Sequence, residues 1–146
     1  VFALVNSYRR DHGLEELRWE ESLAVVCRLH CRRMAESESY LGHAGIDFRG
    51  ALAGAIVDCI VYRENVGMTL NVDHPAQGVV MSWLESGSHR RNIESDATLS
   101  GVGVSIGESG ACFFVQIFVK DLTYIPGEDR TIYPEPSIER YVEPRP

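Results

Sequence analysis

Residues 83–93 read WLESGSHRRNI, and the rest of the chain can be placed around them. Apolar side chains at helical spacing lead into this stretch and place its start on the buried face of a helix: Ala76, Val79, Val80 and Trp83. The sequence Ser86-Gly87-Ser88 ends that helix, because glycine tolerates left-handed backbone and serine favours caps and turns. His89 therefore stands where a new short helix begins, and backbone on both sides holds it so that its ring can point into a cleft.

Helical spacing of apolar residues also predicts three helices earlier in the chain, over residues 1–12, 21–36 and 46–57. Gly13 takes the C-cap role behind the first of them. A loop at residues 42–45 separates the second helix from the third. A brief strand at residues 60–62 then runs into residues 63–66.

The last third of the chain changes from helical to alternating periodicity. Apolar residues alternate along 102–106 and again along 113–119, with a glycine-containing turn at 107–110 between them, which predicts a β-hairpin. The second strand is apolar on both faces, so it should be central and covered by helices on each side. The predicted helices come early in the chain and the antiparallel strands come late, and this order indicates an α+β or layered α-β-α domain.

Composition and charge limit the classes of protein that the chain can belong to. It is 45% hydrophobic and 24% charged, as in ordinary globular domains, and its formal net charge is −7. This acidity argues against a nucleic-acid partner, which needs a basic patch. No apolar run approaches the roughly 20 residues that span a bilayer. Prolines and acids dominate the end of the chain, so we predict a domain over residues 1–120 and a tail over 121–146, either loose or folded back into a groove.

The chain has four cysteines, which allow three pairings: Cys27, Cys31, Cys59 and Cys112. Cys27 and Cys31 lie on the apolar face of a predicted helix. We interpret them as small buried hydrophobic residues or as halves of two disulfides, with half of a metal site as the alternative. We also consider a disulfide from this helix to Cys59. His30, on the same face, is interpreted as a core histidine with a satisfied ring.

Seven short motifs occur along the chain in a fixed order. They are Asn6-x-Tyr8-Arg9 with Gly13-Leu14, Leu17-x-Trp19, Gly42-His43-Ala44, Arg63-Glu64-Asn65-Val66, Trp83-x-x-Ser86-x-x-His89-Arg90-x-Asn92-Ile93, Gly101-Val102-Gly103-Val104 and Phe114-Val115-Gln116-Ile117-Phe118. In this order they resemble the CAP superfamily, also called SCP/TAPS, which includes cysteine-rich secretory proteins, insect venom antigen 5 and plant pathogenesis-related proteins of class 1. The Ser-x-x-His-Arg-x-Asn-Ile form is similar to the shorter bacterial members, and the resemblance covers about residues 1–120.

The resemblance implies a three-layer α-β-α sandwich with a small antiparallel sheet between helices. It also implies a large open cleft that holds two histidines and acidic residues. On the matching positions, His43 is the first cleft histidine, Glu64 the acid and His89 the second histidine. Asn65, next to the acid, is interpreted as bracing the cleft backbone through its amide.

Two imidazoles and a carboxylate can hold a divalent metal such as Zn²⁺, so His43, Glu64 and His89 are predicted as its ligands. The same three groups can instead form a hydrogen-bonded cluster without metal, in which the carboxylate fixes the imidazole tautomers. Eukaryotic members of the superfamily have a second glutamate three residues after the tryptophan. This chain has Ser86 there, and Glu85 is the nearest candidate for the second acid.

For function, the resemblance implies a secreted or surface-exposed binding domain, without enzymatic activity, that recognises a lipid, a sterol or a protein partner. The sequence shows no obvious nucleophile. A hydrolase is the alternative, either metal-assisted or with Ser86 or Ser88 beside His89, because a nucleophilic serine needs a base within hydrogen-bond reach. A structural interaction module that makes contact through the proline-rich tail is a further alternative.

Overall fold

The computed structural model describes residues 1–37 and 41–123. Within these residues the elements are α1 (Phe2–Asp11), β1 (Arg18–Trp19), α2 (Glu21–Ser37), α3 (Ile46–Ile56), β2 (Cys59–Thr69), α4 (Pro75–Glu85), α5 (Gly87–Ile93), β3 (Leu99–Ile106) and β4 (Cys112–Asp121). The first three predicted helices are confirmed to within one residue at each end. Most of the predicted tail lies outside the described residues, and the domain boundary at residue 120 stays a prediction.

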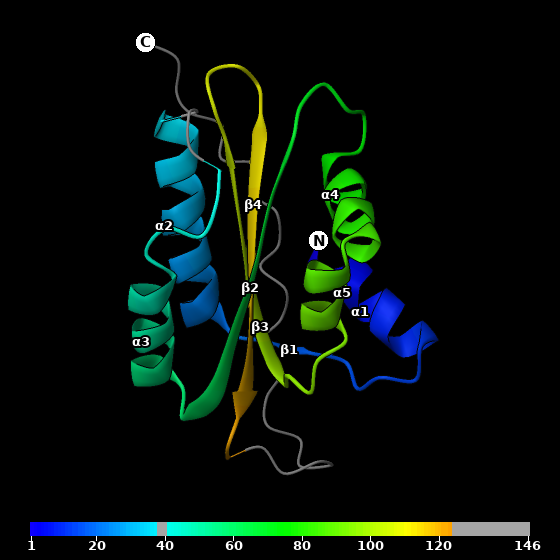
Figure 1. The fold of residues 1–146 in the computed structure, drawn as a ribbon, viewed down its shortest axis with the longest axis vertical. Helices are drawn as coiled ribbons and strands as arrows, with labels where there is room; N and C mark the ends of the chain where they lie inside the picture. The colour runs from blue at the N-terminus through cyan, green and yellow to red at the C-terminus, as the bar shows by residue number, and fades with distance from the viewer. Residues whose placement is uncertain (38–40, 124–146) are drawn as a thin grey trace.

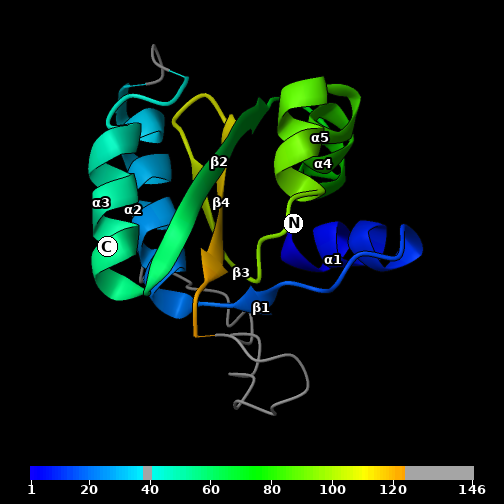
Figure 2. The ribbon, with the colours of Figure 1, turned by 60° about the horizontal axis from the view of Figure 1, so that its bottom comes forward.

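Helices cover both faces of a four-stranded sheet whose order is β1-β3-β4-β2. Helices α2 and α3 lie on one face, and α1, α4 and α5 lie on the other (Figure 1, Figure 2). This arrangement confirms the predicted α+β, three-layer α-β-α fold. The sheet is mixed rather than wholly antiparallel, because the two-residue strand β1 pairs in parallel with β3. Four helices and β2 separate these strands in the chain, and such a long crossover allows the parallel direction.

Strand β4 is central, as its two apolar faces predicted. Every residue from 113 to 119 is buried. Phe113, Val115, Ile117 and Val119 join the core under α2 and α3. Phe114 and Phe118 join a second core with Val79, Trp83 and Ile93, under α1, α4 and α5. One strand therefore supplies both hydrophobic cores.

Glycines on β3 allow α2 to lie directly on the sheet. A Cβ atom at Gly101 would meet the α2 backbone at Leu23 and Ala24, and one at Gly103 would meet it at Cys27 and Arg28. The repeated glycine of the Gly101-Val102-Gly103-Val104 motif thus follows from close contact between a helix and a strand.

The cysteines behave as buried hydrophobic residues in the contact between α2 and the sheet. Cys27 and Cys31 are fully buried, and Cys27 Sγ donates to the Gly101 carbonyl at 3.2 Å. Burial raises the pKa of the Cys31 thiol to about 12, and it also raises that of Cys27. All four cysteines are free thiols, so the disulfide to Cys59 that we considered is absent.

Two local expectations were wrong. Strand β2 is eleven residues long rather than brief, since it pairs with β4 as far as Thr69. Gly67, two residues before its end, packs against Val79 and Trp83 without interrupting the strand. The break between α4 and α5 is made by Ser86 in an extended conformation (φ −83°, ψ 118°), and not by a left-handed Gly87.

Candidate functional site

The candidate site is built around Glu64, on the β2 face that lies against α3. Its side chain is completely buried and accepts four hydrogen bonds. Arg49, on α3, donates from Nε to Oε2 and from Nη2 to Oε1, both at 2.6 Å. Tyr62 donates its hydroxyl to Oε2 at 2.8 Å, and His43 Nδ1 lies 3.0 Å from Oε1. Both carboxylate oxygens are therefore fully engaged within the protein.

The electrostatic balance keeps Glu64 charged. Burial alone would raise the pKa of its carboxyl, but hydrogen bonds from Arg49, His43 and Tyr62 outweigh burial and lower the pKa. Burial and the Glu64 charge raise the pKa of Tyr62 well above its ordinary value, so this side chain remains a hydroxyl donor. The result is a buried carboxylate paired with a guanidinium in fork geometry.

The loop before α3 presents His43 to solvent. Side chains from α3 and α2 hold this loop in place. Arg49 Nη1 donates to the Ala44 carbonyl at 2.7 Å, and His30 Nε2 lies 2.8 Å from the Gly42 carbonyl. His30 is buried and hydrogen-bonded, as predicted for a core histidine. The His43 side chain is 45% exposed. Because the charged Glu64 carboxylate can only accept a hydrogen bond, the Nδ1 atom of His43 carries the proton. The Nε2 lone pair of His43 is left for a ligand.

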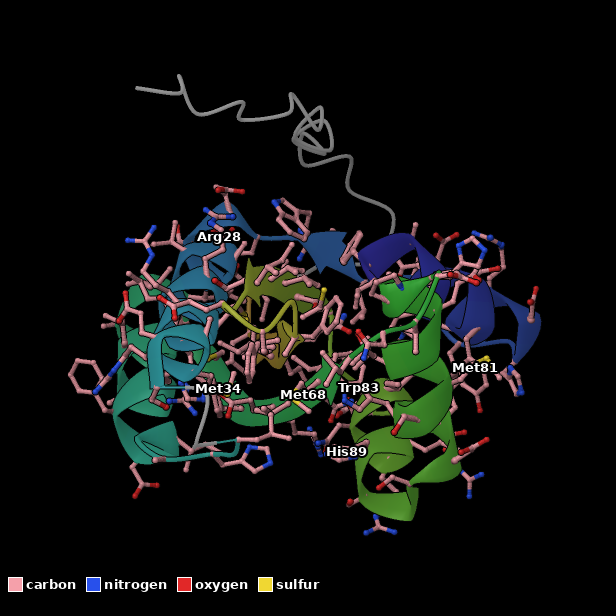
Figure 3. All side chains as sticks on the ribbon, turned by 90° about the horizontal axis from the view of Figure 1, so that it is seen from above. Arg28, Met34, Met68, Met81, Trp83 and His89 are labelled. Carbon is pink, nitrogen blue, oxygen red and sulfur yellow. The ribbon has the colours of Figure 1, made fainter. Side chains whose placement is uncertain are left out.

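The second histidine, His89, is the third residue of α5 and is half-buried. It projects from α5 towards the side where α2 and α3 lie (Figure 3). Burial, and then the charge of His43, lower the pKa of His89, which favours a neutral imidazole at pH 7. Its backbone carbonyl accepts from Asn65 Nδ2 at 3.1 Å, and Asn92 Nδ2 donates to Asn65 Oδ1 at 2.8 Å. These amides join α5 to β2.

Strand β2 is an edge strand of the sheet, and side chains from the neighbouring helices satisfy part of its outer edge. Asn92 Nδ2 also donates to the Glu64 carbonyl at 3.2 Å. Trp83 Nε1 donates to the Val66 carbonyl at 3.1 Å. The motif from Trp83 to Asn92 therefore places α4 and α5 against the strand that carries Glu64.

The remaining candidates lie apart from this cluster. Glu85 is exposed at the end of α4, and its side chain forms no hydrogen bond or ion pair with any other described residue. The hydroxyls of Ser86 and Ser88 lie 3.2 Å from each other. Within residues 1–37 and 41–123, neither serine is hydrogen-bonded to His89.

Three residues that were not predicted as site residues complete the cluster: Arg49, Tyr62 and Asn92. Tyr62 precedes Glu64 by two residues, so strand periodicity could have placed both on one face. Asn92 follows His89 by three residues and shares a helix face with it. No local pattern connects Arg49 with Glu64, since their contact depends on how α3 packs on β2.

The three predicted ligands do not fit a zinc ion in this arrangement. Both Glu64 oxygens accept from Arg49, and the described residues contain no group of three or more His, Cys, Asp or Glu side chains able to hold a metal. Glu64 instead accepts a hydrogen bond from Nδ1 of His43. In metal sites, carboxylates often bind the ring nitrogen of a histidine ligand that does not contact the metal. Direct ligands would then be His43 and His89 alone.

Comparisons with known proteins agree with this architecture. The sequence model of the cysteine-rich secretory protein family, CAP, matches residues 2–118. The chain belongs to this family. A search among curated proteins finds no match.

Solved structures of three other proteins superpose on the chain. An extracellular protein containing an SCP domain from Bacillus anthracis is 25% identical with a TM-score of 0.65, over 82% of this chain and 39% of that one. An outer surface protein from Borrelia burgdorferi is 17% identical with a TM-score of 0.67, over 82% of this chain and 89% of that one. A cysteine-rich secretory protein from Staphylococcus aureus is 21% identical with a TM-score of 0.58, over 82% of this chain and 36% of that one. The chain thus spans about two fifths of the first and third proteins.

Proposed function

We propose that this CAP domain is a non-enzymatic binding domain, secreted or exposed at a cell surface, that recognises a lipid, a sterol or a protein partner. The observation that carries the proposal is the state of Glu64. A general base needs a free lone pair within reach of its substrate. Glu64 is buried, charged and bonded on both oxygens, so it acts as a scaffold that orients His43.

The geometry of the serines also supports binding over hydrolysis. A serine nucleophile needs a hydrogen bond to its base. Ser86 and Ser88 lie within hydrogen-bonding distance of each other, and neither is bonded to His89 in the described residues. The imidazoles of His43 and His89 are instead suited to contact a bound ligand.

The proposed location rests on the relatives, which are described as extracellular, outer surface and secretory proteins. No described helix is long and apolar enough to cross a membrane. A protein partner or a membrane-derived ligand is accessible from such a location.

A binding and hydrolysis panel tests the proposal. We expect sterol or phospholipid vesicles to bind the chain, with affinity at least about tenfold lower in His43→Ala and His89→Ala, about 1.4 kcal/mol. His74→Ala, which removes an exposed histidine on a different loop, is the matched control and should bind as the wild type does. Peptide or ester turnover that disappears in His89→Ala would instead establish a hydrolase. If the chain binds none of the lipids and sterols, the proposal of a lipid or sterol ligand is wrong and only that of a protein partner is left.

We also propose that a divalent metal, when bound, is held by the imidazoles of His43 and His89. Zinc binding measured by calorimetry should be lost in either alanine variant and kept in His74→Ala. Metal requires neutral imidazole, so affinity should fall between about pH 7 and pH 5 as protons compete for the same nitrogens. A pH-independent affinity, or one that survives removal of both histidines, would place the metal elsewhere.

A further inference from the structure

The outer edge of β3 is open over most of its length. Strand β1 pairs only with Leu99 and Ser100, whereas the ladder between β3 and β4 continues to Ile106. Beyond Ser100, the outer edge of β3 therefore has no strand partner in the described part of the chain. The other edge strand, β2, differs in this respect, because Trp83 and Asn92 donate hydrogen bonds to its outer carbonyls.

Hydrogen bonds at the two ends of β3 show which of its backbone groups face the open edge. The Ser100 carbonyl faces outward, because it accepts from the Glu20 amide at 2.9 Å. The Gly107 amide faces β4, because it donates to the Ala111 carbonyl at 2.9 Å. Even-numbered residues of β3 thus turn their N–H and C=O groups outward, since these directions alternate along a strand. Beyond Ser100, the outward groups are those of Val102, Val104 and Ile106.

The side chains of β3 do not protect this edge. Residues 101–106 read GVGVSI, without a charge or a proline, and the pairing with β4 has no bulge. Val104 and Ile106 are 47% and 67% exposed. Proteins protect an edge strand with charges, prolines, bulges or a covering segment, because an open apolar edge pairs with other strands. Since β3 has none of the first three, we expect a segment of polypeptide to cover it.

A groove of about 560 Å³ lies beside the open edge, between β3 and α2. Arg32 and Glu36 line it from the helix, and Ser105 and Ile106 line it from the strand. Arg28, one turn before Arg32, lies on the side of α2 where β1 also lies (Figure 3). The groove therefore has room for the side chains on one face of an added strand.

The C-terminal segment of the chain, outside the described residues, starts close to this edge. Strand β4 ends at Asp121, whose amide donates to Thr98 Oγ1 at 2.9 Å, directly before β3 begins. Val102 lies four residues after Thr98, about 13 Å along the strand. The nine residues from Asp121 to Arg130 can span about 30 Å, which is enough to pass β1 and reach Val102. A segment that arrives from there runs parallel to β3.

The sequence Arg130-Thr131-Ile132-Tyr133 suits this position. Threonine, isoleucine and tyrosine favour strands, and here they are consecutive. With Ile132 beside Val104, the odd-numbered residues of the segment turn their backbone groups towards β3 and the even-numbered residues turn theirs away. Pro126 and Pro134, on either side of the segment, are both even-numbered, so neither interrupts the pairing.

We propose that residues 130–133 add to the sheet as a further strand, parallel to β3, and close its open edge. In this register the Val104 amide donates to the Thr131 carbonyl, and the Ile106 amide donates to the Tyr133 carbonyl. The end of the chain thereby protects the sheet from pairing with a strand of another molecule.

Residue-resolved amide hydrogen exchange on the full chain tests this pairing. We expect the amides of Val104 and Ile106 to exchange at least about tenfold more slowly in the wild type than in Thr131→Pro, which removes an N–H that faces β3. The amides of Gly103 and Ser105 face β4 and should be equally protected in both proteins, which shows that the domain is folded.

The matched control is Arg130→Pro. In the proposed register the Arg130 N–H faces away from β3, where an edge strand tolerates proline, so Val104 and Ile106 should stay protected. Equal effects of Arg130→Pro and Thr131→Pro would overturn the proposed pairing. Wild-type amides of Val104 and Ile106 that exchange as fast as those of an unfolded peptide would also overturn it.

Two other occupants of the edge would give different results. If a second copy of the chain covers β3, sedimentation shows a dimer, and the protection of Val104 is lost on dilution but kept in Thr131→Pro. If the second proline-free stretch of the tail, residues 137–143, covers β3, protection is lost in Val142→Pro and kept in Thr131→Pro. Either result would overturn the assignment of the edge to residues 130–133.

Discussion

Replacement of Arg49 by alanine is expected to destabilise the domain by about 3–5 kcal/mol at pH 7. The Arg49 side chain is 6% exposed and that of Glu64 is completely buried, so the pair is shielded from water. Without the guanidinium, Glu64 would remain buried with only His43 and Tyr62 as partners, and an uncompensated buried charge is among the most costly defects in a folded protein. Urea unfolding of the variant and the wild type measures the difference.

The pH dependence of this loss identifies Glu64 as its origin. In the wild type the pKa of Glu64 is lowered on folding, so its contribution to stability is present above the unfolded pKa of about 4.3 and is lost as the pH falls through the lower folded value. In Arg49→Ala, burial remains and the strongest opposing partner is gone, so the neutral acid becomes favourable. The destabilisation should therefore be smaller at pH 5 than at pH 7.

Two variants serve as controls for the Arg49 experiment. Arg49→Lys keeps a cation but not the fork geometry, and should lie between wild type and alanine. Arg10→Ala breaks an ion pair with Glu16 whose side chains are 58% and 50% exposed, and should cost at most about 1 kcal/mol. A cost for Arg49→Ala no larger than that of Arg10→Ala, at both pH values, would mean that the pair contributes no more than a surface ion pair.

The sequence predicted those parts of the fold that depend on local periodicity. Helical spacing identified α2 and α3 to within a residue, and the two apolar faces of residues 113–119 placed β4 at the centre of the sheet. The parallel pairing of β1 could not be predicted, because two residues carry no periodicity and their partner lies 81 residues later. Strand β2 was underestimated, because it is extended to Thr69 by pairing with β4, a contact between distant parts of the chain.

For the site, the motifs located Glu64 and both histidines, but not the chemistry that joins them. Two histidines and a glutamate fit a zinc site when they are considered alone. Arg49, 15 residues before Glu64, occupies both carboxylate oxygens and turns the acid into a buried ion pair. Residue spacing cannot reveal this competition, because it arises from the packing of a helix on an edge strand.

Replacement of Gly103 by alanine is expected to destabilise the domain by at least about 3 kcal/mol. The added methyl group would meet the backbone of Cys27 and Arg28, and a backbone inside a helix cannot rotate away as a side chain can. Helix α2 would have to move off β3, which would loosen the core that contains Leu23, Cys27 and Val115.

Gly54→Ala is the matched control, because Gly54 is exposed inside α3 and no atom beyond its chain neighbours and the backbone of its own helix lies within 4 Å of the Cβ position. The same change should there stabilise the domain by about 0.5–1 kcal/mol, since alanine favours a helix over glycine. Urea unfolding of both variants measures the contrast. Equal stability of Gly103→Ala and the wild type would show that α2 does not lie as close to β3 as the structure places it, and that the glycines of the motif have another role.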